Sequence, residues 1–245
     1  HRDCLCDLQP AMETLAAETR AWRADRHGWV ASGMRLWKRR PLQKVFGKYH
    51  PMRFEDDPAR ARSLKRPWMV WSGKAEIGHE DAVRVEDGFL RSRGLGAELI
   101  PPLSLVTDDL GIYYDPTRPS RLEHLIRDRR SLRPDQIARA DALRRALTSA
   151  GLSKYNLSGD VPDLPKGQRV LVVGQVEDDA SIRLGAGEIR TNRALLEQAR
   201  VARPDAVLIY KPHPDVEAGL RDGAFDAADL ADVVADETDI AALLD

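Results

Sequence analysis

Arg169-Val-Leu-Val-Val-Gly-Gln-Val-Glu-Asp-Asp-Ala-Ser181 is the most informative segment of the 245-residue chain. Residues 170–173 form a continuous apolar, mostly β-branched run, which is typical of a strand buried on both faces of a parallel sheet. Gly174 ends the run, and the polar side chains of Gln175, Glu177, Asp178 and Asp179 follow. Because open α/β sheets bind ligands beyond the carboxyl ends of their strands, this loop is a candidate site.

The same arrangement recurs downstream. Residues 206–210 predict a second buried strand, and Lys211-Pro-His-Pro214 follows its end directly. A helix is predicted between the two strands over residues 191–202, with Thr191 or Asn192 as its cap. A strand–helix–strand unit of this kind forms a right-handed crossover. If the strands are neighbours, about 4.8 Å apart, Asp179 and His213 leave the same sheet edge and could face one pocket.

The composition limits the class of protein. Hydrophobic residues make up 42% and charged residues 31% of the chain, as in soluble globular proteins. A formal net charge of −1 argues against a protein-wide attraction to nucleic acid, so we expect no nucleic-acid partner. No apolar run approaches the roughly 20 residues of a membrane span. Cys4 and Cys6 are too few for a structural zinc site, and we expect reduced thiols in a cytoplasmic protein.

Two domains are expected, 1–160 and 161–245, because residues 158–167 have the composition of a linker. The first domain is predicted to contain a leading helix at 11–26, strands at 68–72 and 82–85, and a strand pair at 103–106 and 111–115. A helix is predicted after Pro134, with Ile137, Leu143 and Leu147 directed inward. The residues after the linker supply few strands for a complete doubly wound domain. Since the chain also begins at His1, we expect a fragment with a truncated C-terminal domain.

Polar residues also follow the strand predicted at 82–85. Glu86 lies just past it, and Gly88 permits a tight turn or close backbone approach. Arg91 can hold a carboxylate in a bidentate pair. Lys154 and Asn156 can reach a ligand, although a plain hinge loop is equally compatible with the sequence, as is a surface role for Glu86.

The residue types around Asp179 suit glycosyl transfer. A carboxylate can stabilise or trap the oxocarbenium-like transition state of that reaction. Groups such as Lys211 and His213 can meet a phosphate leaving group. The residues alone also allow a solvated acidic loop at 177–179 and a histidine that simply packs in a stiff turn between two prolines.

Taken together, Gln175-Val-Glu-Asp-Asp179 and Lys211-Pro-His-Pro214 resemble the paired motifs of the bacterial KpsC-type β-Kdo glycosyltransferases of capsule assembly. The resemblance runs from about Trp37 to Arg221 and includes the segments 85–92, 102–105, 111–115, 154–156 and 178–182. It implies an α/β, GT-B-like fold, in which two Rossmann-like domains with parallel sheets flank the active site.

The resemblance also implies an activity. The donor would be cytidine monophosphate-Kdo (CMP-Kdo), and Kdo would pass with retention to a lipid-linked Kdo oligosaccharide. The resemblance implies no metal and no separate cofactor. It implies a cytoplasmic location with peripheral contact at the inner face of the inner membrane.

Residue roles follow by matching motifs. Asp179 matches the nucleophile of a double displacement, and Gln175 would support it. His213 matches the histidine expected at the donor phosphate, and Glu86 would be the acid or base facing the acceptor. Further substrate contacts are expected from Arg91, Lys154, Asn156, Asp178, Ser181 and Lys211.

Two alternatives remain open at the level of sequence. Glu177, Asp178 and Asp179 offer oxygen ligands for Mg²⁺ in a metal-dependent sugar-nucleotide transferase or phosphohydrolase. A non-catalytic module would instead bind an anionic glycolipid through the basic residues Arg35, Lys38, Arg39 and Arg40. For this segment the sequence favours a helix end whose charges face water.

Overall fold

The computed structural model describes residues 7–244, so Cys4 and Cys6 lie outside the described residues. The chain divides into two compact units. The first comprises the residues up to Glu86 with 106–111 and 121–143, and the second comprises 87–105, 112–120 and 144 onward. Each unit is described by itself.

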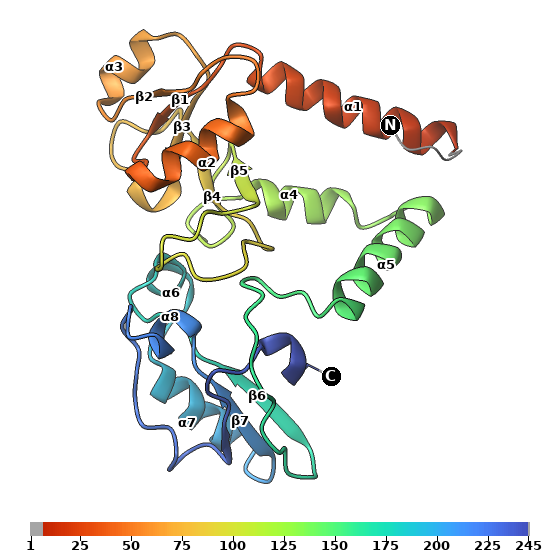
Figure 1. The fold of residues 1–245 in the computed structure, drawn as a ribbon, viewed down its shortest axis with the longest axis vertical. Helices are drawn as coiled ribbons and strands as arrows, with labels where there is room; N and C mark the ends of the chain where they lie inside the picture. The colour runs from red at the N-terminus through yellow and green to blue at the C-terminus, as the bar shows by residue number, and fades with distance from the viewer. Residues whose placement is uncertain (1–6, 245) are drawn as a thin grey trace. The chain divides into compact units, whose positions relative to one another are not determined.

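A five-stranded sheet, with the strand order β2-β1-β3-β4-β5, organises the first unit (Figure 1). Its strands are β1 (Val30–Ser32), β2 (Arg53–Phe54), β3 (Trp68–Trp71), β4 (Val83–Asp87) and β5 (Leu105–Asp108). The pairs β1–β2, β1–β3 and β3–β4 are parallel. Both Val30 and Val70 are fully buried, as expected for strands covered on two faces.

Helices of the N-terminal half precede, connect or follow these strands. They are α1 (Leu8–Asp25), α2 (Leu36–Phe46), α3 (Pro58–Ser63), the 3-10 turn η1 (Ser72–Lys74), α4 (Arg121–Asp128) and α5 (Pro134–Ser149). The basic residues 35–40 lie at the start of α2, which continues through Pro41. Among the described residues, none of the helices combines the length and apolarity needed to cross a membrane.

A three-stranded parallel sheet organises the second unit. It has the order β6-β7-β8, formed by β6 (Arg169–Val173), β7 (Val207–Lys211) and β8 (Val233–Val234). The helices are α6 (Ala180–Gly185), α7 (Asn192–Ala202), α8 (Pro214–Glu217) and the 3-10 turn η2 (Ile240–Leu243). In Figure 1, α7 lies along β6 and β7, and its Leu196 is fully buried in a core with Val172 and Leu208. The predicted strand–helix–strand unit is confirmed.

Two sequence predictions are wrong. Residues 111–115 do not form a strand. Instead, Asp108 Oδ1 accepts hydrogen bonds from the backbone N–H groups of Leu110 and Gly111, which turns the chain away after β5. The predicted inward face of α5 is also wrong, because Ile137 and Leu143 are 53% and 59% exposed.

The domain boundary predicted at residue 160 stays a prediction. In the sequence, the strands of the five-stranded sheet precede the predicted linker at 158–167, and the strands of the three-stranded sheet follow it. The compact units, however, assign residues 87–105, 112–120 and 144–160 to the same unit as the C-terminal sheet. This grouping places most of the predicted site residues within one unit.

We expect Leu196→Ala to lower the free energy of unfolding by about 2–5 kcal/mol, because it leaves a cavity between α7 and the sheet. Chemical denaturation measures the change. Val201→Ala, on the same helix but at a side chain that is 74% exposed, should change stability by less than about 0.5 kcal/mol. Equal effects of the two substitutions would contradict the packing described for α7.

Candidate active site

The ends of β6 and β7 meet at one sheet edge. Val173 pairs with Lys211, and the Gly174 N–H donates a 2.7 Å hydrogen bond to the Lys211 carbonyl. A Cβ atom at Gly174 would lie 2.7 Å from the Tyr210 hydroxyl and 3.1 Å from Pro212 Cα. Only glycine allows this approach without a shift of the neighbours. The loop that carries Asp179 and the loop that carries His213 therefore begin side by side, as the sequence predicted.

Asn192 fixes the first loop. Its Oδ1 accepts a 2.7 Å hydrogen bond from Gln175 N, and its Nδ2 donates to the carbonyls of Gln175 and Gly223 at 2.8 and 2.9 Å. Its own N–H donates to Glu177 Oε1 at 2.7 Å. Asn192 is 2% exposed, and Thr191 is the residue that caps α7. Sequence analysis named Asn192 only as an alternative cap and missed this bracing role.

Asp179 lies where the braced loop enters α6. It is the N-cap residue, and its Oδ1 accepts hydrogen bonds from Ser181 N at 2.9 Å and Ser181 Oγ at 2.8 Å. These bonds fix the rotamer of a half-buried carboxylate at the sheet edge. Neighbouring Asp178 is exposed and forms a 2.7 Å ion pair with Arg221. The three acids of the loop thus have three different partners.

His213 caps α8 with its ring. Its Nδ1 accepts a 3.1 Å hydrogen bond from the Asp215 N–H, so the neutral imidazole carries its proton on Nε2. Burial lowers the pKa of His213 to about 4, and the positive charges of Lys154, Arg221 and Lys211 act in the same direction against the opposing effect of Asp179. At neutral pH, His213 is therefore an uncharged hydrogen-bond donor through Nε2.

A second chain segment joins this site. The backbone N–H groups of Arg91 and Gly94 donate to the carbonyls of Lys154 and Tyr155 at 2.9 and 2.8 Å. Asn156 Nδ2 donates to the Ser92 carbonyl at 2.8 Å, so this predicted ligand contact has a structural bond within the fold. The segments 91–94 and 154–156 are therefore joined by hydrogen bonds.

The side chain of Arg91, in the first of these segments, is buried and is 1% exposed. Its Nε donates to Asp87 Oδ2 and its Nη1 donates to Ser92 Oγ, both at 2.7 Å. Its Nη2 has no hydrogen-bond partner within residues 7–244. A Cβ atom at Gly96 would lie 2.8 Å from Nη2, so the glycine makes room for the guanidinium.

Lys211 has a different environment from the one predicted. It is 3% exposed, and its Nζ lies 2.7 Å from each oxygen of Glu217. Glu217 Oε1 also accepts a hydrogen bond from Glu237 N at 2.9 Å. The structure thus gives Lys211 a buried intramolecular partner, and its contact with a ligand stays a prediction.

Two further charged residues belong to the site but were missed. Asp215 is 8% exposed, and its Oδ1 has no hydrogen-bond partner in the described part of the chain. Burial raises the pKa of Asp215, although the charges of Arg221, Arg91 and Lys154 lower it. The positive charges of three residues therefore act on one buried carboxyl group. Asp215 follows the His-Pro pair directly, a signal that sequence analysis could have used, whereas Arg221 carried no such signal.

Glu86 lies near the end of β4 (Val83–Asp87), just past the apolar residues of that strand as predicted, and belongs to the first unit. The second unit holds Asp179, His213, Gln175 and the predicted substrate contacts. It brings Asp179 and His213 together, and it adds the charges of Arg91 and Lys154, which act on Asp215.

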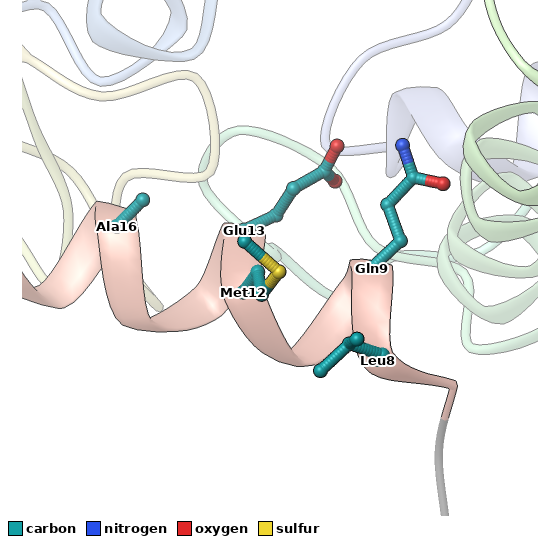
Figure 2. Close-up of a pocket in the computed structure, with 5 residues that line it drawn as sticks. All are labelled: Leu8, Gln9, Met12, Glu13 and Ala16. Carbon is teal, nitrogen blue, oxygen red and sulfur yellow. The ribbon is translucent and has the colours of Figure 1, made fainter.

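A hollow on the first unit carries no comparable chemistry. Figure 2 shows that its lining comes from one helix, α1, through Leu8, Gln9, Met12, Glu13 and Ala16. Glu13 forms an ion pair with Arg133. Within residues 7–244, no group of three or more His, Cys, Asp and Glu side chains is arranged to hold a metal ion.

Comparison with known proteins identifies the family. A model of the family described as "Capsule polysaccharide biosynthesis protein" matches residues 73–159 and 160–243. The chain belongs to this family. The matched residues include Glu86, Gln175, Asp179 and His213.

Two relatives match most of this chain over only part of their own length. "Capsule polysaccharide modification protein LipA" of Neisseria meningitidis serogroup A is 40% identical over 233 residues, covering 85% of the chain and 32% of LipA. "Lipopolysaccharide-processing protein LpsZ" of Rhizobium meliloti is 46% identical over 263 residues, covering 96% of the chain and 60% of LpsZ. The chain thus spans about a third of LipA and less than two thirds of LpsZ.

Two solved structures share the fold. "Thermosulfurimonas dismutans KpsC, beta Kdo 2,4 transferase" has a TM-score of 0.66 and 28% identity, over 88% of this chain and 70% of the other. "Thermosulfurimonas dismutans KpsC, beta Kdo 2,7 transferase" has a TM-score of 0.64 and 27% identity, over 85% and 67%. The predicted KpsC-type resemblance and the GT-B-like α/β fold with parallel sheets are confirmed.

We expect Asn192→Ala to lower the free energy of unfolding by about 2–3 kcal/mol, because it leaves buried backbone groups of the Gln175 loop without partners. Thermal or chemical unfolding measures this change. Gln198→Ala removes a matching amide from an exposed position of the same helix and should be nearly neutral. A neutral Asn192→Ala would contradict the bracing role.

We also expect His213 to make stability depend on pH. Its folded-state pKa of about 4 lies below its ordinary value of 6.5, so the unfolded chain binds the proton first as the pH falls. This group leaves the free energy of unfolding unchanged above pH 6.5 and lowers it progressively between 6.5 and 4, by at most about 3 kcal/mol.

Urea unfolding of the native protein and of His213→Gln across this pH range tests that expectation. The native protein should lose more stability than the variant as the pH falls. Parallel pH profiles of the two proteins would contradict the lowered pKa of His213.

Proposed function

We propose that this capsule biosynthesis protein is a glycosyltransferase that moves Kdo from CMP-Kdo to a Kdo-containing acceptor. The observation that carries the proposal is that Asp179 and His213 begin from adjacent strand ends at one sheet edge. The similarity to two KpsC structures that are described as Kdo transferases supports the choice of sugar.

Asp179 is proposed as the nucleophile. A carboxylate oxygen of Asp179 forms a bond to the anomeric carbon of Kdo while the bond from that carbon to the phosphate oxygen breaks, and CMP leaves with the electron pair. An acceptor hydroxyl then attacks the same carbon, the Asp179 ester bond breaks, and the hydroxyl proton passes to a base. Two inversions give net retention. Glu86 is the proposed base.

His213 is proposed to meet the leaving phosphate. Neutral at physiological pH, it can donate its Nε2 proton in a hydrogen bond to a phosphate oxygen as negative charge develops there. Arg91, Lys154 and Arg221, whose charges act on the neighbouring Asp215, supply positive charge for the phosphate and for the Kdo carboxylate. Lys211, held by Glu217, supports the loop that carries His213.

Several further parts of the proposal come from the resemblance. The acceptor is a lipid-linked Kdo oligosaccharide, and the protein works in the cytoplasm with a peripheral contact to the inner membrane. No metal and no separate cofactor takes part. Ser181 orients Asp179, and Gln175, whose backbone is held by Asn192, supports it.

Intact-mass spectrometry of the purified protein with CMP-Kdo and without acceptor tests the proposal. We expect one added Kdo mass in the native protein, because the glycosyl-enzyme accumulates when no acceptor removes it. The adduct should disappear in Asp179→Asn, which removes the nucleophilic oxygen. Asp229→Asn, a matched change at an exposed acid, should retain it.

The other outcomes are equally informative. Donor consumption without an adduct would contradict the covalent role of Asp179. An adduct that persists in Asp179→Asn would place the nucleophile elsewhere. If the donor is neither bound nor consumed with or without Mg²⁺, the proposed Kdo chemistry is wrong, and consumption that a chelator abolishes would favour a metal-dependent enzyme.

A further inference from the structure

Tyr155 contacts the proposed catalytic histidine directly. Its ring centroid lies 5.9 Å from that of His213, and the two ring planes meet at 80°. This edge-to-face arrangement is a favoured geometry for aromatic pairs. Both residues belong to the second compact unit. Sequence analysis assigned roles to Lys154 and Asn156 on either side of Tyr155 but none to Tyr155 itself.

The backbone around Tyr155 is fixed independently of His213. The Tyr155 carbonyl accepts a hydrogen bond from Gly94 N, and the Lys154 carbonyl accepts one from Arg91 N. Asn156 follows with a φ of +50°, and its Oδ1 and N–H exchange hydrogen bonds with Ser153 N and Ser153 Oγ. The ring of Tyr155 is therefore presented by an ordered turn, anchored to the segment above buried Arg91.

His213 is held on a second side by its own helix. The Asp215 N–H donates to Nδ1, which specifies both the ring orientation and the tautomer. A 180° rotation of the imidazole about χ2 would break this bond, because a ring carbon would then face the Asp215 N–H group in place of Nδ1. The edge-to-face contact with Tyr155 packs the imidazole from another side, which restricts rotation of the ring away from the Asp215 N–H and covers part of the ring against water.

We propose that Tyr155 is a positioning residue that holds the His213 imidazole in its Nε2-protonated orientation and shields it from water. Its role in turnover rests on the proposed function, whereas its effect on His213 does not. The charged groups that act on His213 are Lys154 beside Tyr155, Asp179 from the loop after β6, Lys211 at the end of β7, and Arg221 after α8. Asp215 contributes the N–H bond.

The shielding has a predictable direction. Burial is the largest cause of the lowered pKa of His213, and the neighbouring cations add to it. Removing the Tyr155 ring admits water, so the pKa of His213 should rise from about 4 toward its ordinary 6.5. We expect a rise of about one unit or more in Tyr155→Ala and a value close to native in Tyr155→Phe, which keeps the ring.

Nitrogen-15 NMR of the imidazole groups tests this across acidic and neutral pH, with the His213 signals assigned by their loss in His213→Gln. The native protein and Tyr155→Phe should show a single tautomer protonated at Nε2. Tyr155→Ala should show a raised pKa and a mixture of tautomers. Tyr49→Ala, which removes a 43% exposed tyrosine of the first unit, is the matched control and should leave His213 unchanged.

Kinetics provide the second measurement. In the Kdo transfer assay, Tyr155→Ala should lower kcat about tenfold or more with little change in the KM for donor, and the acid limb of its pH profile should shift upward. Tyr155→Phe should restore most of the activity.

Each result decides something. A His213 pKa and tautomer that are unchanged in Tyr155→Ala would overturn the proposal, as would a native His213 that titrates near 6.5. If Tyr155→Ala does not fold, the pKa and tautomer of His213 are measured in the native protein and in Tyr155→Leu, which retains apolar volume without the ring. These two measurements then test the proposal. If the NMR shifts appear but the native protein transfers no Kdo, Tyr155 positions His213 and the proposed function alone is wrong.

Discussion

The close approach of two loops at Gly174 is the constraint on which the candidate site depends. A hydrogen bond from Gly174 N to the Lys211 carbonyl continues the β6–β7 ladder one residue past the strand end. This register places the Gln175 and His213 loops side by side before either loop has turned. The helix N-termini that receive Asp179 and His213 then fix the two side chains by local hydrogen bonds. The pairing of the strands brings the two loops together, and the local capping bonds then orient the two side chains. Both are needed to form the candidate site.

Most polar side chains around the site serve the loops rather than a ligand. Glu177 bonds to Asn192, Lys211 to Glu217, and Asn156 to Ser92. Burying a polar group lowers the stability of the fold unless the group has a hydrogen-bond partner. Here one residue often forms hydrogen bonds with several neighbours. The exceptions are Arg91 Nη2 and Asp215 Oδ1, which are buried without hydrogen-bond partners among residues 7–244. They belong to the region where the positive charges of three residues act on one carboxyl group. The side chains that support the loops are thus distinct from the two atoms whose hydrogen-bonding capacity is unused.

The sequence predicted the β6–α7–β7 segment better than residues 103–149, for physical reasons. Strands β6 and β7 are uninterrupted apolar runs with a capped helix between them, so periodicity and capping lead to the same result. The segment 111–115 failed because its apolar side chains resemble a strand, while the side chain of Asp108 had already turned the backbone. The contacts of Asn192 with the Gln175 loop and of Tyr155 with His213 arise between separate segments, where no local pattern reports them. The burial of Lys211 was missed for a different reason, because Glu217 becomes its neighbour only when α8 forms.

The pair Lys211–Glu217 has a consequence for how this family can change over time. Either residue alone, without the other, would leave a buried charge uncompensated at a cost of about 3–5 kcal/mol, a large part of the roughly 5–15 kcal/mol that stabilises a typical domain. Replacement of both by apolar residues of similar volume would instead be close to neutral. A change from the charged pair to an apolar pair therefore passes through a single substitution that lowers the stability of the protein. Lineages should carry either both charges or neither, and this inheritance as a unit would arise from folding rather than from catalysis.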